Sequence, residues 1–487
     1  MGMGTTDIEF TTAVALAAAI RRRQFSATEV LEAHLAQIAR RNPALNAIVT
    51  LDEEGARRRA READAALERG ELWGPLHGVP VTVKDSLETA GLRTTAGFPP
   101  LADYVPTEDA SVVARLRAAG ALILGKTNLP PLAGDAQTDN PIFGRTNNRW
   151  DHARTPGGST GGGAAAVAAG LTPLEIGSDL GGSVRLPAHC CGICALKPTD
   201  GRVPLTGHIP EPPGAPRGVR HMAVIGPLAR SVADLRLALG VIAGPDGRRW
   251  ETPPVPLTTS PDRPLPTLRL AWADDIDGLP VTAKTRAALA DLAAELSRCG
   301  ARVVRRWPQG FAAAAALETW GEVYQSEAGS AMPPEAEAET AAWLRGQGDA
   351  LNPMARGRQR RLGATMRQYT ETLTRREALI GRLEHFFDDW DALLCPVAAV
   401  PAIPHCPGGT PVLVDATPTD YHMALTAHCM LFNATGHPAV VIPLVCSTEG
   451  LPIGLQVVGR RWDEPLLLAI AAQLAEVIGP LRCPRAE

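Results

Sequence analysis

The stretch "TPGGSTGGGAAAVAAG" (residues 155–170) decides between two folds. Its first half, from Gly157 to Gly161, fits G-x-S-x-G, the pattern around the nucleophilic serine of α/β-hydrolases. Further along the chain, "GSDLGGSVRLPA" (residues 177–188) places a second serine, Ser183, after a Gly-Gly turn. Ser159 and Ser183 are therefore both candidate nucleophiles, and each implies a different fold and chemistry.

The segment before Ser159 argues against a hydrolase elbow. Such an elbow needs an apolar strand that runs directly into the serine, whereas "NNRWDHARTPGG" is polar, charged and interrupted by proline. The elbow also needs a histidine later in the chain. Eight histidines, from His189 to His437, follow Ser159, so counting them decides nothing. The missing strand makes Ser159 the weaker candidate for the nucleophile.

The surroundings of Ser183 suit a nucleophile better. "PLEIGSD" predicts a strand, "GGS" a turn, and "VRLPAHCCGICA" a short helix. Glycines let a backbone approach a ligand and point several N–H groups in one direction. A helix N-terminus adds a positive potential. We therefore predict an oxyanion hole made by the backbone N–H groups of Leu180, Gly181, Gly182 and Ser183.

A serine nucleophile needs a base, and Lys84 is the candidate. "GVPVTVKDSL" (residues 78–87) is an apolar, β-branched run that predicts a buried strand ending at Lys84. Desolvation can lower the pKa of a buried lysine by as much as ~3–5 units, which allows the neutral form at neutral pH. Without the two serine motifs, a lysine at a strand end would be read as a surface residue.

The other elements predict an α/β protein. "DASVVARLRAAG" reads as a helix and "ALILGKTN" as the next strand, and strand–helix–strand order favours α/β layers. Residues 161–169 predict a helix that Gly170 ends, and residues 11–40 are helical, with Ser26 capping a helix and Glu29 completing a capping box. Residues 203–221 read as an ordered loop and residues 283–390 as mostly helical. "DALLCPV", "PAVVIPLV" and "PIGLQVVG" predict late strands, and "EPLLLAIAAQLAEVI" a closing helix.

Composition excludes several classes of protein. The 487 residues are 45% hydrophobic and 21% charged, as in ordinary globular proteins. A net charge of −4 gives no basic excess for nucleic acid. No apolar run approaches the roughly 18 residues of a membrane helix, and the N-terminus lacks the charge order of a signal peptide. We expect no nucleic acid partner and no membrane segment.

The nine cysteines are an odd number spread along the chain, which is not a disulfide framework. We therefore expect reduced thiols and a cytoplasmic location. Cys191 and Cys194 form a C-x-x-C motif, but no second ligand pair follows it at the spacing of a zinc site. We expect these two side chains to pack in the core, and we predict no metal and no cofactor.

The motifs together resemble the amidase signature family. The resemblance rests on Lys84 after its strand, "GGSTGGGAAAVAAG", "GSDLGGSVRLPA" and "CGICALKPT". "GPLHGVPVTVKD", "GKTNLP", "GPLARSVADL" and "GLPIGLQVVG" look like further landmarks, so that nearly the whole chain is covered. The resemblance implies an α/β fold with a central twisted mixed β-sheet sandwiched between α-helices. It also implies one domain over 1–487, with a core at 70–240, a variable helical pocket region at about 283–390 and a return to the sheet at 391–487.

The resemblance implies a Ser–cisSer–Lys triad. Ser183 is then the nucleophile, Ser159 the bridging serine with a cis peptide bond, and Lys84 the base. The family usually has GGSSGG, and Thr160 replaces the second serine here while keeping a hydroxyl. By the same resemblance, the supporting polar residues are Thr160, Ser178, Asp179 and Arg185.

We expect substrate contacts from the loop 132–145, the loop 203–221 and the helical segment 310–400. Few charged groups lie near the motifs, which favours a neutral, partly apolar or aromatic substrate. The chain looks most like the bacterial aryl-acylamidase and urethanase branch, which implies cleavage of small aryl amides and carbamates, with esterase side activity. We also expect a monomer or homodimer. The candidate substrate-binding residues are Gly134, Gln137, Thr138, Ile142, Arg202, Ile209 and Pro210; His208 and Arg220 lie in the same loop as the last two.

Three alternatives remain. The A subunit of an amidotransferase, which releases ammonia from glutamine, would need a partner chain. A binding protein could keep the fold without catalysis, although all three triad positions are intact. "GGSTGGG" could also be a phosphate-binding loop, but the Gly-Lys-Ser/Thr ending of such loops does not follow it.

Overall fold

The computed structural model describes residues 8–209, 217–258, 263–331, 334–346 and 351–483. The strands are Ile48–Leu51 (β1), Pro80–Lys84 (β2), Leu122–Thr127 (β3), Leu174–Asp179 (β4), Cys194–Lys197 (β5), Val224–Ala229 (β6), Arg269–Trp272 (β7), Arg302–Arg305 (β8), Ala392–Pro396 (β9), Val412–Val414 (β10), Thr417–Thr419 (β11), Ala439–Cys446 (β12) and Pro452–Val458 (β13). The α-helices are Ala13–Arg21 (α1), Ala27–Leu45 (α2), Glu53–Glu68 (α3), Ser111–Ala118 (α4), Gly161–Ala168 (α5), Arg185–Cys191 (α6), Val232–Ile242 (α7), Ala283–Arg298 (α8), Ala313–Glu327 (α9), Pro334–Gly346 (α10), Pro353–Arg360 (α11), Met366–Asp389 (α12), Tyr421–Leu425 (α13), Ala427–Ala434 (α14) and Glu464–Ile478 (α15).

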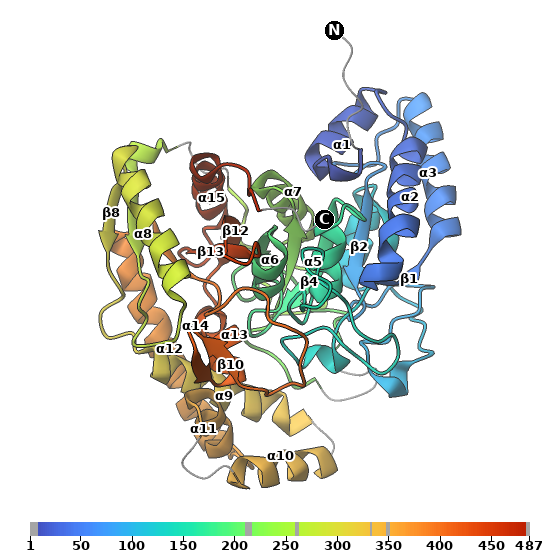
Figure 1. The fold of residues 1–487 in the computed structure, drawn as a ribbon. Helices are drawn as coiled ribbons and strands as arrows, with labels where there is room; N and C mark the ends of the chain where they lie inside the picture. Colours follow the sequence, from blue (N-terminus) through green and yellow to red (C-terminus); the bar gives the residue numbers. More distant parts are fainter. Residues whose placement is uncertain (1–7, 210–216, 259–262, 332–333, 347–350, 484–487) are drawn as a thin grey trace.

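Eleven strands form one mixed sheet, in the order β1-β3-β2-β4-β6-β5-β12-β13-β9-β7-β8. In Figure 1 the sheet runs from β1, on the right, to β8, on the left, and α9, α10 and α11 lie together below it. Strand β2 pairs in parallel with β3 and β4, whereas the middle of the sheet, from β4 to β9, is antiparallel. Helices cover both faces, so the predicted α/β class with a central mixed sheet is confirmed.

The alternation of side chains along β2 and β4 separates the core from the polar groups. Val81 and Ile176 face an apolar core that includes residues of α1, α4, α7 and α15. Because successive strand residues point to opposite faces, Lys84 and Asp179 project from the other face. The register pairs Thr82 with Glu175, so the ends of both strands lie side by side. The carboxyl ends of β2 and β4 thus place a lysine and a carboxylate side by side.

Helix α5 lies close against this polar face because its first turn is made of glycine. A Cβ at Gly163 would lie 2.4 Å from the Glu175 side chain, and one at Gly162 would lie 2.4 Å from the backbone nitrogen of Asn128. Both positions therefore need glycine for space. The helix ends as predicted, with Gly170 at a φ of +74°.

Most predicted elements are present, with shifted bounds. The capping box of Ser26 and Glu29 is confirmed. The helical segment 11–40 is two helices, α1 and α2, with a break at residues 22–26. The short helix expected after Ser183 is α6, which ends before β5 begins. Strands β1, β5, β6, β7, β10 and β11 were not predicted, and β8 interrupts the segment that was expected to be mostly helical.

The cysteines follow the prediction in part. Cys191 and Cys194 are buried free thiols, as expected for core residues. Cys446 and Cys483 form a disulfide that joins the end of β12 to the C-terminal segment, so the expectation of reduced thiols is wrong for this pair. Across the described ranges, none of the helices combines the length and the apolar character needed to cross a bilayer.

Candidate active site

A cavity of about 620 Å³ lies at the end of β4, and Ser159 and Ser183 both line it. All three segments expected to contact the substrate contribute to its wall. The described lining residues are Phe98, Leu132, Ala133, Gly134, Asp135, Ala136, Gly158, Ser159, Ser178, Asp179, Leu180, Gly181, Ser183, His208, Gly218, Val219, Ala223, Trp320, Tyr324, Ala328, Ala331, Ala336, Met354, Arg358, His422, Thr426 and Met430. Apolar side chains dominate this set.

Lys84 is buried and is hydrogen-bonded to two serines. Its Nζ donates to Ser159 Oγ at 2.7 Å and to Ser178 Oγ at 3.1 Å. Burial lowers the pKa of Lys84 to about 7, although the charges of Asp179 and Glu175 oppose this shift. An amine with this pKa exchanges its proton near neutral pH, which is what a base next to a serine hydroxyl requires.

The backbone around Ser159 is tightly enclosed. The peptide bond between Gly158 and Ser159 is cis. A Cβ at Gly158 would lie 2.6 Å from the backbone of Asp135 and Ala136, so this position needs glycine for space. The amide of Thr160 donates to the carbonyl of Ser183 at 3.1 Å. This bond ties the two serine loops to each other at the floor of the cavity.

The backbone amides after β4 divide into two groups. Gly182 N–H donates to Asp179 Oδ1 at 2.9 Å, and Val184 N–H to Asp179 Oδ2 at 3.1 Å. Gly182 was expected to belong to the oxyanion hole, but its amide is engaged by this carboxylate. Within the described part of the chain, the amides of Leu180, Gly181 and Ser183 have no hydrogen-bond partner, and these three residues line the cavity. Three of the four predicted donors thus remain available to a ligand.

Asp179 is held by a buried ion pair with Arg185. The guanidinium donates from Nη2 to Oδ1 at 2.9 Å and from Nε to Oδ2 at 3.1 Å, and Asn433 Nδ2 donates to Oδ1 at 2.8 Å. Burial raises the pKa of the Asp179 carboxyl, but Arg185 and Asn433 outweigh it and hold that pKa well below its usual range. The permanent charge of Asp179 therefore shapes the loop that carries Ser183.

Asn433 and Gln456 were not predicted as part of this site. Gln456 Oε1 accepts from Arg185 Nη1 at 2.7 Å, and the carbonyl of Cys429 accepts from the same nitrogen at 2.9 Å. A signal for Gln456 was present, because it is a polar residue inside the apolar strand "PIGLQVVG". The same kind of signal marks Asn433, a polar residue inside the apolar helix α14.

Of the four candidates in the loop 132–145, Gly134 lines the cavity and the other three do not. The Gln137 side chain donates to the Cys406 carbonyl at 2.7 Å and to the Tyr421 hydroxyl at 3.2 Å. Thr138 Oγ1 donates to the Gly157 carbonyl at 2.9 Å. Ile142 is half-buried outside the cavity wall. Gln137 and Thr138 hold neighbouring loops in place, so the prediction of substrate contact is corrected for them and for Ile142.

The candidates in the next loop are also corrected. Ile209 is buried, and its amide donates to the Ser86 carbonyl at 2.8 Å, away from the cavity wall. Arg202 is buried against Glu464, with Nη2–Oε2 and Nε–Oε2 distances of 2.7 and 3.0 Å. Pro210 lies outside the described residues. The loop reaches the cavity instead through His208, Gly218 and Val219.

Replacing Arg202 by methionine is expected to lower stability without changing substrate affinity. The change would leave the Glu464 carboxylate buried and unpaired, which typically costs about 3–5 kcal/mol. The measurement is urea unfolding beside KM for an amide substrate, with the exposed Arg58→Met as the control. A raised KM together with an unchanged unfolding midpoint would restore Arg202 as a substrate-binding residue.

Helix α9 supplies the aromatic part of the cavity wall. Trp320 and Tyr324 stack with ring centroids 5.1 Å apart, and Trp320 Nε1 donates to the Leu180 carbonyl at 2.9 Å. The indole therefore also holds the backbone next to Ser183. From sequence alone, these aromatics were only part of the segment 310–400, because a stripe of aromatics on a helix usually indicates core packing.

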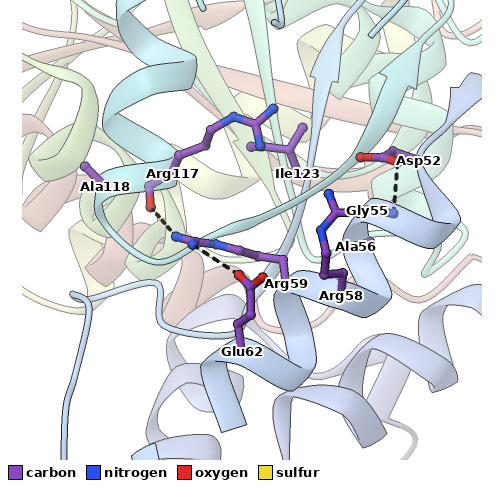
Figure 2. A pocket seen from close by; sticks show the side chains of 9 residues that line it. All are labelled: Asp52, Gly55, Ala56, Arg58, Arg59, Glu62, Arg117, Ala118 and Ile123. Atoms are coloured by element: carbon purple, nitrogen blue, oxygen red, sulfur yellow. Dashed lines mark hydrogen bonds and ion pairs between the residues drawn. The ribbon is translucent and has the colours of Figure 1, made fainter. Parts of the chain in front are cut away.

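A second cleft, of about 490 Å³, lies between α3, α4 and β3 (Figure 2). Two of the three arginines that line it are engaged by the protein: Arg59 lies 3.9 Å over the Trp73 ring and donates to the Arg117 carbonyl at 3.3 Å. Arg117 itself pairs with Asp109 at 3.0 Å. No serine, cysteine or lysine is among the described residues that line this cleft. We therefore place the candidate active site in the cavity at the end of β4, which we call the serine cavity.

Comparison with known proteins places most of the chain in a single protein family. The family model described as Amidase matches residues 29–468. An indoleacetamide hydrolase from Bradyrhizobium diazoefficiens is 34% identical and covers 96% of this chain and 87% of its own length. The A subunit of a glutamyl-tRNA(Gln) amidotransferase from Roseiflexus is 35% identical, over 93% of each chain.

The solved structures agree with the sequence comparison. A bacterial aryl acylamidase of the amidase signature family superposes with a TM-score of 0.79 and 25% identity, over 97% of each chain. Matches of this extent include both serine motifs and the lysine strand. Together with the architecture of the serine cavity, they show that the chain is an amide C–N bond hydrolase and belongs to the amidase signature family.

Proposed function

We propose that this enzyme hydrolyses small, neutral aryl amides and carbamates (urethanes), with esterase side activity, through an acyl-enzyme on Ser183. The observation that carries the proposal is the 2.7 Å hydrogen bond from Lys84 to Ser159 at the floor of an apolar, aromatic cavity that Ser183 also lines. A base, a relay hydroxyl and a nucleophile are the groups that acyl transfer needs.

The proposed reaction has two halves. Neutral Lys84 takes the proton of Ser159, which takes the proton of Ser183, while Ser183 Oγ adds to the substrate carbonyl. The oxygen of the tetrahedral intermediate accepts hydrogen bonds from the amides of Leu180, Gly181 and Ser183. Ser159 then gives a proton to the leaving nitrogen and recovers one from Lys84. Water attacks the acyl-enzyme along the same route and releases the carboxylic acid from an amide, or from a carbamate the carbonic acid monoester, which breaks down to the alcohol and CO2.

The charges around the serine cavity support a neutral substrate. Asp179 is balanced by Arg185, and the two other charged lining residues, Asp135 and Arg358, have opposite signs. Burial lowers the pKa of the lining His422, which favours its neutral form. The stacked rings on α9 offer a flat apolar wall for an aryl group.

The test is a matched substrate panel. We expect release of 4-nitroaniline from its acyl anilides and of an arylamine from N-aryl carbamates. We also expect lower kcat/KM for analogues that carry a carboxylate or an ammonium group on the aryl ring. Failure of folded enzyme to cleave any anilide or N-aryl carbamate would refute the proposal.

The amidotransferase similarity supports a second candidate, a glutamine-hydrolysing subunit that works with a partner chain. Glutamine carries both an ammonium and a carboxylate group, whereas the serine cavity is mostly apolar. A kcat/KM for glutamine above that for aryl amides, measured with the chain alone and with a co-purified partner, would favour this candidate.

A further inference from the structure

His208 lies in the wall of the serine cavity, and the backbone fixes its place there. It forms an antiparallel bridge with Leu87. On either side of this bridge, Glu88 N–H donates to the Gly207 carbonyl at 2.9 Å, and Ile209 N–H to the Ser86 carbonyl at 2.8 Å. The loop that carries His208 is thus attached to the segment that directly follows Lys84.

The His208 imidazole has no partner for its polar atoms within the described residues. Nε2 is buried without a hydrogen bond, whereas Nδ1, which also forms none, is not buried and is the ring nitrogen that a ligand can reach. Burial, and after it the charge of Lys84, lowers the pKa of His208 to about 3. The ring is therefore neutral at working pH and presents one N–H donor and one bare nitrogen acceptor. Such a ring is poorly suited to proton transfer but can form hydrogen bonds to a ligand.

Because His208 is close to Lys84, we infer that it lies on the leaving-group side of the scissile bond. Lys84 is bonded to Ser159, and in the proposed reaction Ser159 delivers the proton to the leaving nitrogen. A group beside Lys84 therefore lies on the leaving-group side of the scissile bond. Amides and carbamates present an N–H there, whereas esters present only an oxygen.

We propose that His208 is a specificity-determining residue whose bare ring nitrogen accepts a hydrogen bond from the N–H of the scissile amide or carbamate. The inference rests on the proposed function and narrows its substrate class to N–H-bearing amides and carbamates. Esters and N-alkylated amides would leave Nδ1, the ring nitrogen that is not buried, without a partner in the filled cavity, and such unpaired polar atoms are costly.

The test compares His208→Phe with wild type on 4-nitroacetanilide, its N-methyl analogue and 4-nitrophenyl acetate. We expect His208→Phe to lose about 10–100-fold in kcat/KM on the anilide and less than about threefold on the ester and on the N-methyl amide. His208→Gln, which restores an acceptor, should recover part of the anilide activity. His385→Phe, a change of an exposed histidine in α12 outside the cavity wall, should leave the anilide-to-ester ratio unchanged.

Equal losses on anilide and ester, or no loss on the anilide, would overturn the role of His208. If His208→Phe does not fold, the wild-type enzyme still decides. Its kcat/KM for the anilide, relative to that for the N-methyl analogue, should be about tenfold or more higher than the ratio of their rates in alkaline hydrolysis. The same ratio in the enzymatic and the alkaline reaction would overturn the role of His208. A wild-type enzyme that cleaves esters but no amides or carbamates would instead refute the proposed function.

Discussion

Ser183→Ala is expected to lower kcat for an aryl amide by at least about 10⁴-fold, the largest loss of any single change in the serine cavity. The variant keeps the unpaired amides of Leu180 and Gly181 and the Lys84–Ser159 bond, because none of these contacts uses the Ser183 hydroxyl. It therefore still binds and polarises the substrate but forms no acyl-enzyme. The residual rate should be that of an oxyanion hole without a nucleophile.

Intact-mass spectrometry after reaction with a sulfonyl fluoride distinguishes the two serines. We expect one adduct on wild type, a slower one on Ser159→Ala, and none on Ser183→Ala. Ser297→Ala, a change of an exposed serine in α8, should label like wild type. An adduct that is lost only in Ser159→Ala would make Ser159 the nucleophile and would contradict the proposed mechanism.

Lys84→Met is expected to lower kcat by about 10³-fold or more, which is within the usual contribution of a general base. Methionine fills similar space without an amine, so Ser159 keeps its enclosure but loses the group that takes its proton. Stability should rise or stay level, because a buried amine that must shed its charge is removed. An activity loss below about tenfold would show that another group activates Ser183.

The pH dependence of wild type follows from the same residue. Because the neutral amine is the active form in the proposed mechanism and the pKa of Lys84 is about 7, kcat/KM should rise with pH through about 7 and then level off. The protonated form, dominant at lower pH, cannot accept the proton of Ser159. The kcat/KM profile of an activated ester, followed from pH 5 to 9, should show this limb in wild type and lack it in Lys84→Met. A limb retained in Lys84→Met would assign it to a different group.

The sequence located the parts of the site that depend on local pattern. The apolar run before Lys84 and the glycines around Ser159 and Ser183 determine a strand end and two turns, and these features are set by neighbours in the chain. The order of elements and the resemblance then predicted the mixed sheet. The structure places Lys84 within hydrogen-bonding distance of Ser159, but the catalytic roles of these residues remain predictions.

The rest of the site depends on contacts between distant segments. Arg202 and Gln137 looked like ligand-binding residues because polar side chains in loops often are, but Arg202 pairs with Glu464 and Gln137 with Tyr421. Their partners lie 262 and 284 residues away in the chain. Local pattern carries no information on such pairs, and for the same reason Asn433 was missed.

Strand β6 was missed for a different physical reason. Its sequence, "VIGPLA", contains Gly226 and Pro227, which usually weaken a strand. In the sheet, a Cβ at residue 226 would lie 2.1 Å from the Leu196 carbonyl oxygen. Glycine is required there by the close approach of β5, a constraint that arises only once the two strands have paired.

The contacts of Arg185 link the Ser183 loop to a strand close to the C-terminus. Lys84, Ser159 and Ser183 all belong to the first half of the chain, but Arg185, which orders the Ser183 loop through Asp179, bonds to Gln456, a residue 271 positions later. A nascent chain can thus carry every reacting side chain while the loop still lacks its anchor. The Ser183 loop therefore gains this anchor only once the C-terminal strand β13 has joined the sheet.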